Sequence, residues 1–203
     1  MPTEVQIVDS HTSSNLRSVI NALEFKGLNS RVVERPDEVR SNSPLLIPGV
    51  GTFSRAMDNL SNAALVDRLR EHGGHAAPLV GICLGMQILF DLGLEGGPTK
   101  GIGFFEGAVT QLPSLDGGTG TLNIGYQTLT SEDVKFGLMG FRAYFAHSYI
   151  VVPEHPGIEI ASASVGGRFF TAAVQSDGVR GVQFHPELSG AAGASLLSNL
   201  LND

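Results

Sequence analysis

The strongest constraint on the fold is a regular alternation of short apolar runs and helical patterns in the first half of the chain. Buried strands are predicted by the apolar runs at residues 5–8, 31–33, 45–47 and 79–82. Helices are predicted where apolar residues recur at helical spacing, over residues 15–25, 59–72 and 87–92. Strands that alternate with helices form largely parallel sheets with helices on both faces, so we expect an α/β fold.

The second half of the chain has a different pattern. Strands are predicted for residues 104–109, 122–130, 143–152, 158–164, 169–174 and 181–184, and a closing helix for residues 191–201. Asp177-Gly178 is typical of a hairpin turn between the last two strands. Because no repeat, linker or low-complexity segment divides the sequence, we expect a single mixed α/β domain over residues 1–203.

Composition argues against several classes of function. Hydrophobic residues make up 42% of the 203 residues and charged residues 16%, which argues against disorder. The net charge of −7 is opposite in sign to the basic surface of nucleic-acid-binding domains. No apolar run approaches the roughly 20 residues that span a bilayer, and residues 1–10 lack a signal-peptide pattern. A single cysteine rules out an internal disulfide, so we expect a reduced, cytoplasmic location.

Cys83 is the first candidate catalytic residue. It lies in Gly81-Ile82-Cys83-Leu84-Gly85, between a predicted strand and a predicted helix, which is typical of a nucleophile elbow. Flanking glycines let the backbones pack closely, and a helix N-terminus favours the reactive thiolate. The N–H of Leu84 would then point toward a developing oxyanion. A small, buried apolar cysteine is the alternative interpretation of this residue alone.

His185 and Glu187 end the last predicted strand, in Gln183-Phe184-His185-Pro186-Glu187. Side chains two apart in an extended segment share a face, so the carboxylate can orient the imidazole. With Cys83 they form a nucleophile, base and orienter set, although His-Pro-Glu alone fits a surface histidine equally well. His72 and His75 flank two glycines, but no cysteine or carboxylate cluster completes a metal site, so we expect no metal.

A glycine-rich turn follows the third predicted strand, in Pro48-Gly49-Val50-Gly51. Its glycines would allow a peptide to flip and aim an N–H into an active site. An ordinary tight turn is an equally good interpretation of this segment alone.

Together these segments resemble the class I, triad-type glutamine amidotransferases, and most closely the glutaminase subunits of imidazole glycerol phosphate synthase in histidine biosynthesis. The resemblance is carried by five stretches spread over most of the chain: Asn15-Leu16-Arg17-Ser18-Val19, Pro48-Gly49-Val50-Gly51-Thr52-Phe53, Gly81-Ile82-Cys83-Leu84-Gly85-Met86-Gln87, Tyr144-Phe145-Ala146-His147-Ser148-Tyr149 and Gly181-Val182-Gln183-Phe184-His185-Pro186-Glu187. The cysteine and histidine stretches are specific for the class, and Pro-Gly-Val-Gly-x-Phe points to this subunit within it.

The resemblance implies a flavodoxin-like fold with a mixed, mostly parallel central sheet. It implies that Cys83 is the nucleophile, His185 the base and Glu187 its orienter. Oxyanion N–H groups would come from Val50 and Leu84, and bound glutamine would be surrounded by Gly49, Gln87, Glu95, Ser148 and Tyr149. The expected reaction is hydrolysis of glutamine to glutamate and ammonia through a cysteine thioester, without a metal or organic cofactor. The expected partner is a (β/α)8-barrel cyclase subunit, in a heterodimer, which uses the ammonia to make imidazole glycerol phosphate and AICAR.

The chain departs from the family pattern at positions that the resemblance places near the synthase interface. A short glycine-containing loop after the first strand is replaced by the longer Ser10-His11-Thr12-Ser13-Ser14 region. The usual Pro-His-x-Gly-Trp-Asn becomes Leu122-Asn123-Ile124-Gly125-Tyr126-Gln127, and a usual lysine becomes Leu188. Alternative functions are therefore a paralogous glutaminase subunit that feeds another acceptor, such as a polysaccharide sugar, a stand-alone γ-glutamyl cysteine hydrolase, or a non-catalytic interaction subunit.

Overall fold

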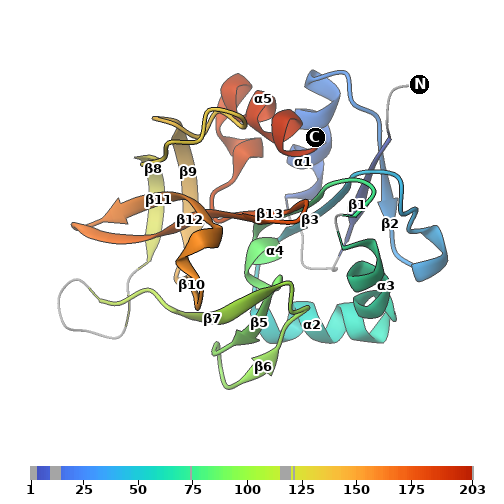
Figure 1. Cartoon of the computed structure of the whole chain (residues 1–203), viewed down its shortest axis with the longest axis horizontal. Helices are drawn as coiled ribbons and strands as arrows, with labels where there is room; N and C mark the ends of the chain where they lie inside the picture. Colours follow the sequence, from blue (N-terminus) through green and yellow to red (C-terminus); the bar gives the residue numbers. More distant parts are fainter. Residues whose placement is uncertain (1–3, 10–14, 74, 115–119, 121, 203) are drawn as a thin grey trace.

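A seven-stranded sheet forms the centre of the molecule (Figure 1). The computed structural model describes residues 4–9, 15–73, 75–114, 120 and 122–202. In spatial order the strands of this sheet are β11 (Glu159–Val165), β12 (Arg168–Ser176), β13 (Val179–Val182), β4 (Leu79–Cys83), β3 (Leu45–Gly49), β1 (Val5–Val8) and β2 (Ser30–Val33). The strands from β13 to β2 run parallel, whereas β12 pairs antiparallel with β13 on one side and with β11 on the other, which confirms a mixed, mostly parallel sheet.

Helices cover both faces of this sheet (Figure 1). Helices α1 (Leu16–Phe25) and α5 (Gly190–Leu200) pack on one face, and α2 (Phe53–Asn62) and α3 (Leu65–His72) lie on the other. Every residue of β3 and β4 is buried, as their continuous apolar runs require when both faces of a strand are covered. Each face therefore has its own hydrophobic core, and the carboxyl ends of β3, β4 and β13 meet between the two.

Two smaller sheets flank the carboxyl ends of these strands. One has the order β10 (Tyr149–Pro153), β7 (Phe105–Gln111), β5 (Phe90–Gly93) and β6 (Thr99–Lys100), and the other pairs β8 (Asn123–Thr128) with β9 (Arg142–His147). The remaining short elements are α4 (Leu84–Gln87), η1 (Pro36–Glu38), η2 (Pro156–Ile158) and η3 (Pro186–Leu188). No helix in the described ranges is long and apolar enough to cross a membrane.

The prediction of one helix over residues 59–72 was wrong. Two helices, α2 and α3, occupy this region and are separated at Ala64, whose φ of 54° lies in the left-handed region. Leu60 on α2 and Leu65 and Leu69 on α3 are all buried in the same core, so the apolar spacing continues across the break. An alanine carries no local signal for a left-handed conformation, because its Cβ disfavours it.

The helix predicted for residues 87–92 was also wrong. Helix α4 ends at Gln87, and the chain passes into β5, where Phe90 packs against Phe105 at 5.3 Å between ring centroids. Ile88, Leu89 and Phe90 are all completely or almost completely buried, and such a short apolar run fits a buried strand as well as a helix.

The strand predicted for residues 143–152 is two strands. The chain leaves β9 at His147 and enters β10 at Tyr149, and the two strands belong to different sheets. The carbonyl of Ser148, between them, accepts a hydrogen bond from the N–H of Leu112 at 2.8 Å. The strand predicted at residues 181–184 begins two residues earlier, as β13, and the predicted turn before it is confirmed, with φ values of 46° at Asp177 and 81° at Gly178.

Candidate active site

Cys83 lies at the sharp junction between β4 and α4, as the sequence predicts. Its φ of 54° and ψ of −109° place a residue with a side chain in a region that L-amino acids rarely adopt. Such strain is stored where surrounding structure holds it, and it turns the thiol out of the strand toward the end of the sheet. The cysteine is unpaired and only 5% exposed.

The two glycines of the elbow are needed for close backbone packing. A Cβ on Gly81 would lie 2.5 Å from the carbonyl oxygen of Gly85, and a Cβ on Gly85 would lie 1.7 Å from that of Ile47. Either methyl group would overlap the backbone, which cannot yield as a flexible side chain can. The Gly-x-Cys-x-Gly spacing is therefore a packing requirement of this turn.

His185 and Glu187 form a buried hydrogen-bonded pair beside the elbow. Nδ1 of His185 lies 2.8 Å from Oε1 of Glu187, and the two side chains are 3% and 1% exposed. The N–H of His185 donates to the carbonyl of Tyr144 at 2.8 Å, and the hydroxyl of Ser189 donates to the carbonyl of His185 at 2.7 Å. The backbone of this turn is thus held from two sides.

Electrostatics favour the charged form of this histidine. Burial lowers the pKa of His185, but hydrogen bonding to the side chains of Cys83 and Glu187, together with their negative charge, raises that pKa to about 10. An imidazolium at neutral pH next to the sulfur is the arrangement that supports a thiolate nucleophile.

A small cavity of about 80 Å³ opens next to the sulfur. It is lined by Val50, Gly51, Cys83, Leu84, Gln87, Glu95, Ala146, His147, Ser148 and Tyr149. The structure therefore brings together Val50, Leu84, Gln87, Glu95, Ser148 and Tyr149, which the sequence assigned to oxyanion or glutamine binding.

Gly49 and Glu95, which the sequence assigned to glutamine binding, have different positions relative to the cavity. Gly49 does not line the cavity but packs against the elbow, where an added Cβ would lie 3.2 Å from the Cβ of Leu84. Oε2 of Glu95 accepts a hydrogen bond from the N–H of Phe53, the first residue of α2, at 2.8 Å. A carboxylate is favoured at a helix N-terminus, so this contact holds the cavity wall against α2.

Two buried residues that the sequence did not assign complete the surroundings of the cavity. Gln183 is fully buried, and its Nε2 donates to Sγ of Cys83 at 3.6 Å. His147 is 6% exposed, and burial lowers its pKa to about 4, so it is neutral at physiological pH. Both lie in stretches that carry the resemblance, but nothing in the local pattern separates them from ordinary core residues.

Asn123 and Gln127, which depart from the family pattern, form a hydrogen-bonded chain that ends on His147. Nδ2 of Asn123 lies 2.9 Å from Nε2 of His147, and the amide of Gln127 donates to Oδ1 of Asn123. Nδ1 of His147 lies 2.9 Å from the carbonyl oxygen of Tyr149, so the ring carries its proton on Nδ1. Asn123 is only 2% exposed and thus supports the cavity wall from inside.

The remaining residues that depart from the family pattern lie at the surface, where Tyr126 contacts Leu188. The hydroxyl of Tyr126 donates to the carbonyl of Leu188 at 3.0 Å, and the Tyr126 ring packs against Tyr144. Leu122 and Ile124, on either side of Asn123, are 65% and 60% exposed. Residues 10–14 lie outside the described ranges, so the altered loop after β1 is not placed.

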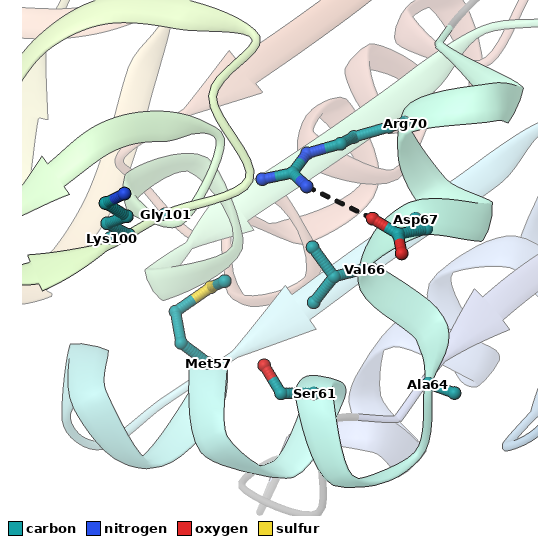
Figure 2. A pocket seen from close by; sticks show the side chains of 8 residues that line it. All are labelled: Met57, Ser61, Ala64, Val66, Asp67, Arg70, Lys100 and Gly101. Carbon is teal, nitrogen blue, oxygen red and sulfur yellow. Dashed lines mark hydrogen bonds and ion pairs between the residues drawn. The ribbon is translucent and has the colours of Figure 1, made fainter.

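A second, more open pocket of about 430 Å³ lies at α2 and α3 (Figure 2). Figure 2 shows Arg70 paired with Asp67. The nitrogen and oxygen of this ion pair lie 3.1 Å apart, and Nε of Arg70 also donates to the carbonyl of Ile102. None of the predicted site residues lines this pocket. Within the described part of the chain, no group of three or more histidine, cysteine, aspartate or glutamate residues could hold a metal ion.

Comparison with known proteins decides the family. The model of the family described as glutamine amidotransferase class-I matches residues 6–203, almost the whole chain. The chain belongs to the class-I glutamine amidotransferases.

Within this family, the similar curated proteins include HisH subunits of imidazole glycerol phosphate synthase. The amidotransferase chain is 37% identical to imidazole glycerol phosphate synthase subunit HisH of Synechococcus sp. (strain CC9902), over 93% of this chain and 89% of that protein. It is equally identical to HisH of Aquifex aeolicus (strain VF5), with 95% and 94% covered. It is also 35% identical to the chloroplastic imidazole glycerol phosphate synthase hisHF of Arabidopsis thaliana, of which it matches only 33%.

Solved structures support the amidotransferase fold. A crystal structure described as a glutamine amidotransferase has a TM-score of 0.74 at 20% identity, with 97% of this chain and 96% of that chain covered. The structure of PurLQS from Thermotoga maritima has a TM-score of 0.76 at 21% identity, with 99% and 98% covered. At this identity the likeness concerns the fold.

Proposed function

We propose that this class-I amidotransferase hydrolyses glutamine with a Cys83–His185–Glu187 triad and supplies ammonia to a (β/α)8-barrel cyclase in imidazole glycerol phosphate synthase. The observation that carries the proposal is the buried His185–Glu187 pair beside a strained cysteine, at the wall of a small cavity. A nucleophile, a base and an orienter within one buried site are the parts that acyl transfer from an amide needs.

Acylation begins when the thiolate of Cys83 attacks the side-chain amide carbon of glutamine. The carbonyl oxygen becomes an oxyanion, which the N–H of Leu84 and, after a peptide flip, the N–H of Val50 stabilise. The imidazolium of His185 gives its proton to the leaving nitrogen, so ammonia departs and a γ-glutamyl thioester remains. The carboxylate of Glu187 holds the ring in position throughout.

Deacylation uses the same groups in the opposite direction. Neutral His185 takes a proton from water, and the resulting hydroxide attacks the thioester carbon. The carbon–sulfur bond then breaks, which releases glutamate and returns the sulfur to the thiolate form. The protonated His185 and the thiolate are then ready for the next glutamine.

Ammonia has to reach the partner without meeting bulk water, which would protonate it. The relatives' names support a partner: the Synechococcus and Aquifex relatives are named subunit HisH, and the Arabidopsis relative, three times the length matched here, is named hisHF. We place a cyclase subunit, in a heterodimer, on the exposed apolar residues Leu122, Ile124 and Tyr126, of which Tyr126 donates a hydrogen bond to the carbonyl of Leu188.

A glutamine-mimicking diazoketone tests the catalytic part. It should label Cys83 stoichiometrically and abolish hydrolysis, and Cys83→Ala should be inert to it and inactive, while its circular dichroism stays unchanged. Glutaminase activity that survives in Cys83→Ala would sink the triad assignment.

Reconstitution with the cyclase tests the partner. A stable complex whose glutaminase rate rises when the cyclase ligand binds supports the synthase, because only differential affinity can favour the flipped state of the oxyanion loop. Full activity of the isolated chain would favour a stand-alone hydrolase, and activation by a different acceptor enzyme would favour the paralogous subunit.

A further inference from the structure

Gln183 places an amide group against the sulfur of Cys83 from the side of β13. It follows β13 directly and is fully buried, and its N–H donates to the carbonyl of Ala172 at 2.9 Å. Nε2 of its side chain lies 3.6 Å from Sγ of Cys83, within the range of hydrogen bonds to sulfur. Gln183 also precedes His185 by two residues, so both side chains reach the sulfur from one segment.

Neighbouring groups determine which end of this amide faces the sulfur. The carbonyl oxygen of Tyr149 can only accept, so the atom of Gln87 that lies 3.1 Å from it must be the donor Nε2. The same Nε2 lies 3.1 Å from the Gln183 side chain, which must therefore present its oxygen to Gln87. The amino group of Gln183 is left to face Cys83, and its orientation follows from a backbone carbonyl.

An N–H donor acts differently on the two forms of a cysteine. A thiolate is a strong acceptor and a thiol a weak one, so a fixed donor next to the sulfur favours the charged form. Cys83 and Gln183 are both buried, so the effect is larger than in water, because less solvent competes for the sulfur. A buried glutamine without partners would destabilise the fold, and an apolar side chain would fill the same space without that penalty.

We propose that Gln183 is a further catalytic residue, whose side-chain N–H stabilises the Cys83 thiolate, with Gln87 as the positioning residue that aims it. The inference rests on Cys83 as the nucleophile of the proposed function. The same donor assists twice in each turnover: it favours the thiolate before attack on glutamine, and it stabilises the thiolate that leaves when water cleaves the thioester. Gln87 thereby couples the glutamine cavity, which it lines, to the sulfur.

The direct test is the pH dependence of Cys83 alkylation by iodoacetamide in the full-length chain. In Gln183→Met, which keeps the volume and removes the donor, the midpoint should move up by about one pH unit, a tenfold loss of thiolate at a given pH. In Gln183→Glu, which keeps the shape, the midpoint should move further, because an ionised carboxylate repels the thiolate. Gln175→Met, on the neighbouring strand β12 and outside the site, is the matched control and should leave the profile unchanged.

Steady-state kinetics separate this role from packing. Loss of the donor should lower kcat for glutamine hydrolysis about tenfold, with the pH–rate profile shifted in the same direction as alkylation, and should change KM little. Gln87→Met, which releases the orientation of the Gln183 amide, should give a smaller shift of the same sign. Circular dichroism checks that each variant folds. If Gln183→Met does not fold, Gln183→Glu replaces it in the alkylation and kinetic measurements.

The possible outcomes distinguish a failure of the role proposed for Gln183 from a failure of the proposed function. An alkylation midpoint that is the same in the wild type, Gln183→Met and Gln183→Glu overturns the role of Gln183, even if activity falls, because a merely structural residue would lower activity without moving the thiolate equilibrium. If Cys83→Ala retains hydrolysis, the proposed function itself fails. If Cys83→Ala is inactive and the Gln183 variants titrate like the wild type, only the present inference fails.

Discussion

Nδ1 of His185 and Oε1 of Glu187 lie 2.8 Å apart, although only Pro186 separates the two residues in the chain. The contact is possible because the segment leaves β13 in an extended conformation, with φ −103° and ψ 92° at His185, before η3 begins. It leaves the other ring nitrogen for the sulfur. Oε2 of Glu187 is buried and has no hydrogen-bond partner in the described part of the chain, so the carboxylate is committed to the imidazole.

This contact predicts unequal effects for the two residues. His185→Asn should raise the barrier to glutamine hydrolysis by at least several kcal/mol, because triad members act as a unit. Glu187→Gln should have a smaller effect, because it misorients the imidazole without removing it. The measurement is kcat/KM for both variants.

A matched control for these substitutions is the exposed pair of His155 and Glu106, which lie 2.8 Å apart with side chains 69% and 67% exposed. His155→Asn and Glu106→Gln should leave the rate unchanged. If Glu187→Gln proved more harmful than His185→Asn, the assigned roles of base and orienter would be wrong.

Acid should destabilise the fold through His147. Burial lowers its folded pKa to about 4 from an ordinary 6.5, so below pH 6.5 the unfolded chain binds a proton that the folded chain does not. The contribution of His147 to the free energy of unfolding is therefore fully present above pH 6.5. It is lost as the pH falls toward 4, and the loss amounts to at most about 3 kcal/mol. Urea unfolding at several pH values measures the loss.

The comparison variant is His147→Gln, in which the decline between pH 6.5 and 4 should be shallower than in the wild type. Some decline should remain, because burial also lowers the pKa of His72. Identical pH dependence in the two proteins would mean that the fold does not lower the pKa of His147.

The elbow should not tolerate a methyl group at Gly85. A Cβ there would lie 1.7 Å from the backbone oxygen of Ile47, so Gly85→Ala should lower the free energy of unfolding by about 3 kcal/mol or more. Gly157→Ala is the control, because its Cβ would meet nothing within 4 Å, and it should change stability by less than about 0.5 kcal/mol. Chemical denaturation gives the free energy of unfolding of both variants. Equal values for Gly85→Ala and Gly157→Ala would contradict the packing requirement at Gly85.

We expect Leu188 to contribute to binding of the cyclase partner, so that its replacement by lysine should weaken the complex. If the cyclase presents no buried acid opposite it, Leu188→Lys buries an unmatched charge and should weaken the complex by about 2 kcal/mol or more. Val32→Lys, on β2 at the far edge of the central sheet, should leave the dissociation constant unchanged. Tighter binding by Leu188→Lys would mean that the leucine is a defect in an otherwise ordinary interface.

Local pattern was enough to predict the fold class and the geometry of the candidate catalytic segments. Continuous apolar runs predicted β1, β3 and β4, because strands covered on both faces have no polar side. Gly81, Cys83 and Gly85 predicted the elbow, and the spacing of His185 and Glu187 predicted their contact, since in each case the residues concerned lie within a few positions of one another.

Only the tertiary structure decided which buried polar residues surround the sulfur and where the elements end. Gln183 reaches Cys83 across 100 positions and Gln87 across 96, and periodicity has no information about contacts at that separation. The left-handed Ala64 that divides α2 from α3 carries no local signal, because alanine favours an unbroken helix. The break at Ser148 arises because β9 and β10 pair with different sheets, so the strand partners, which lie far away in the chain, determine where each strand stops.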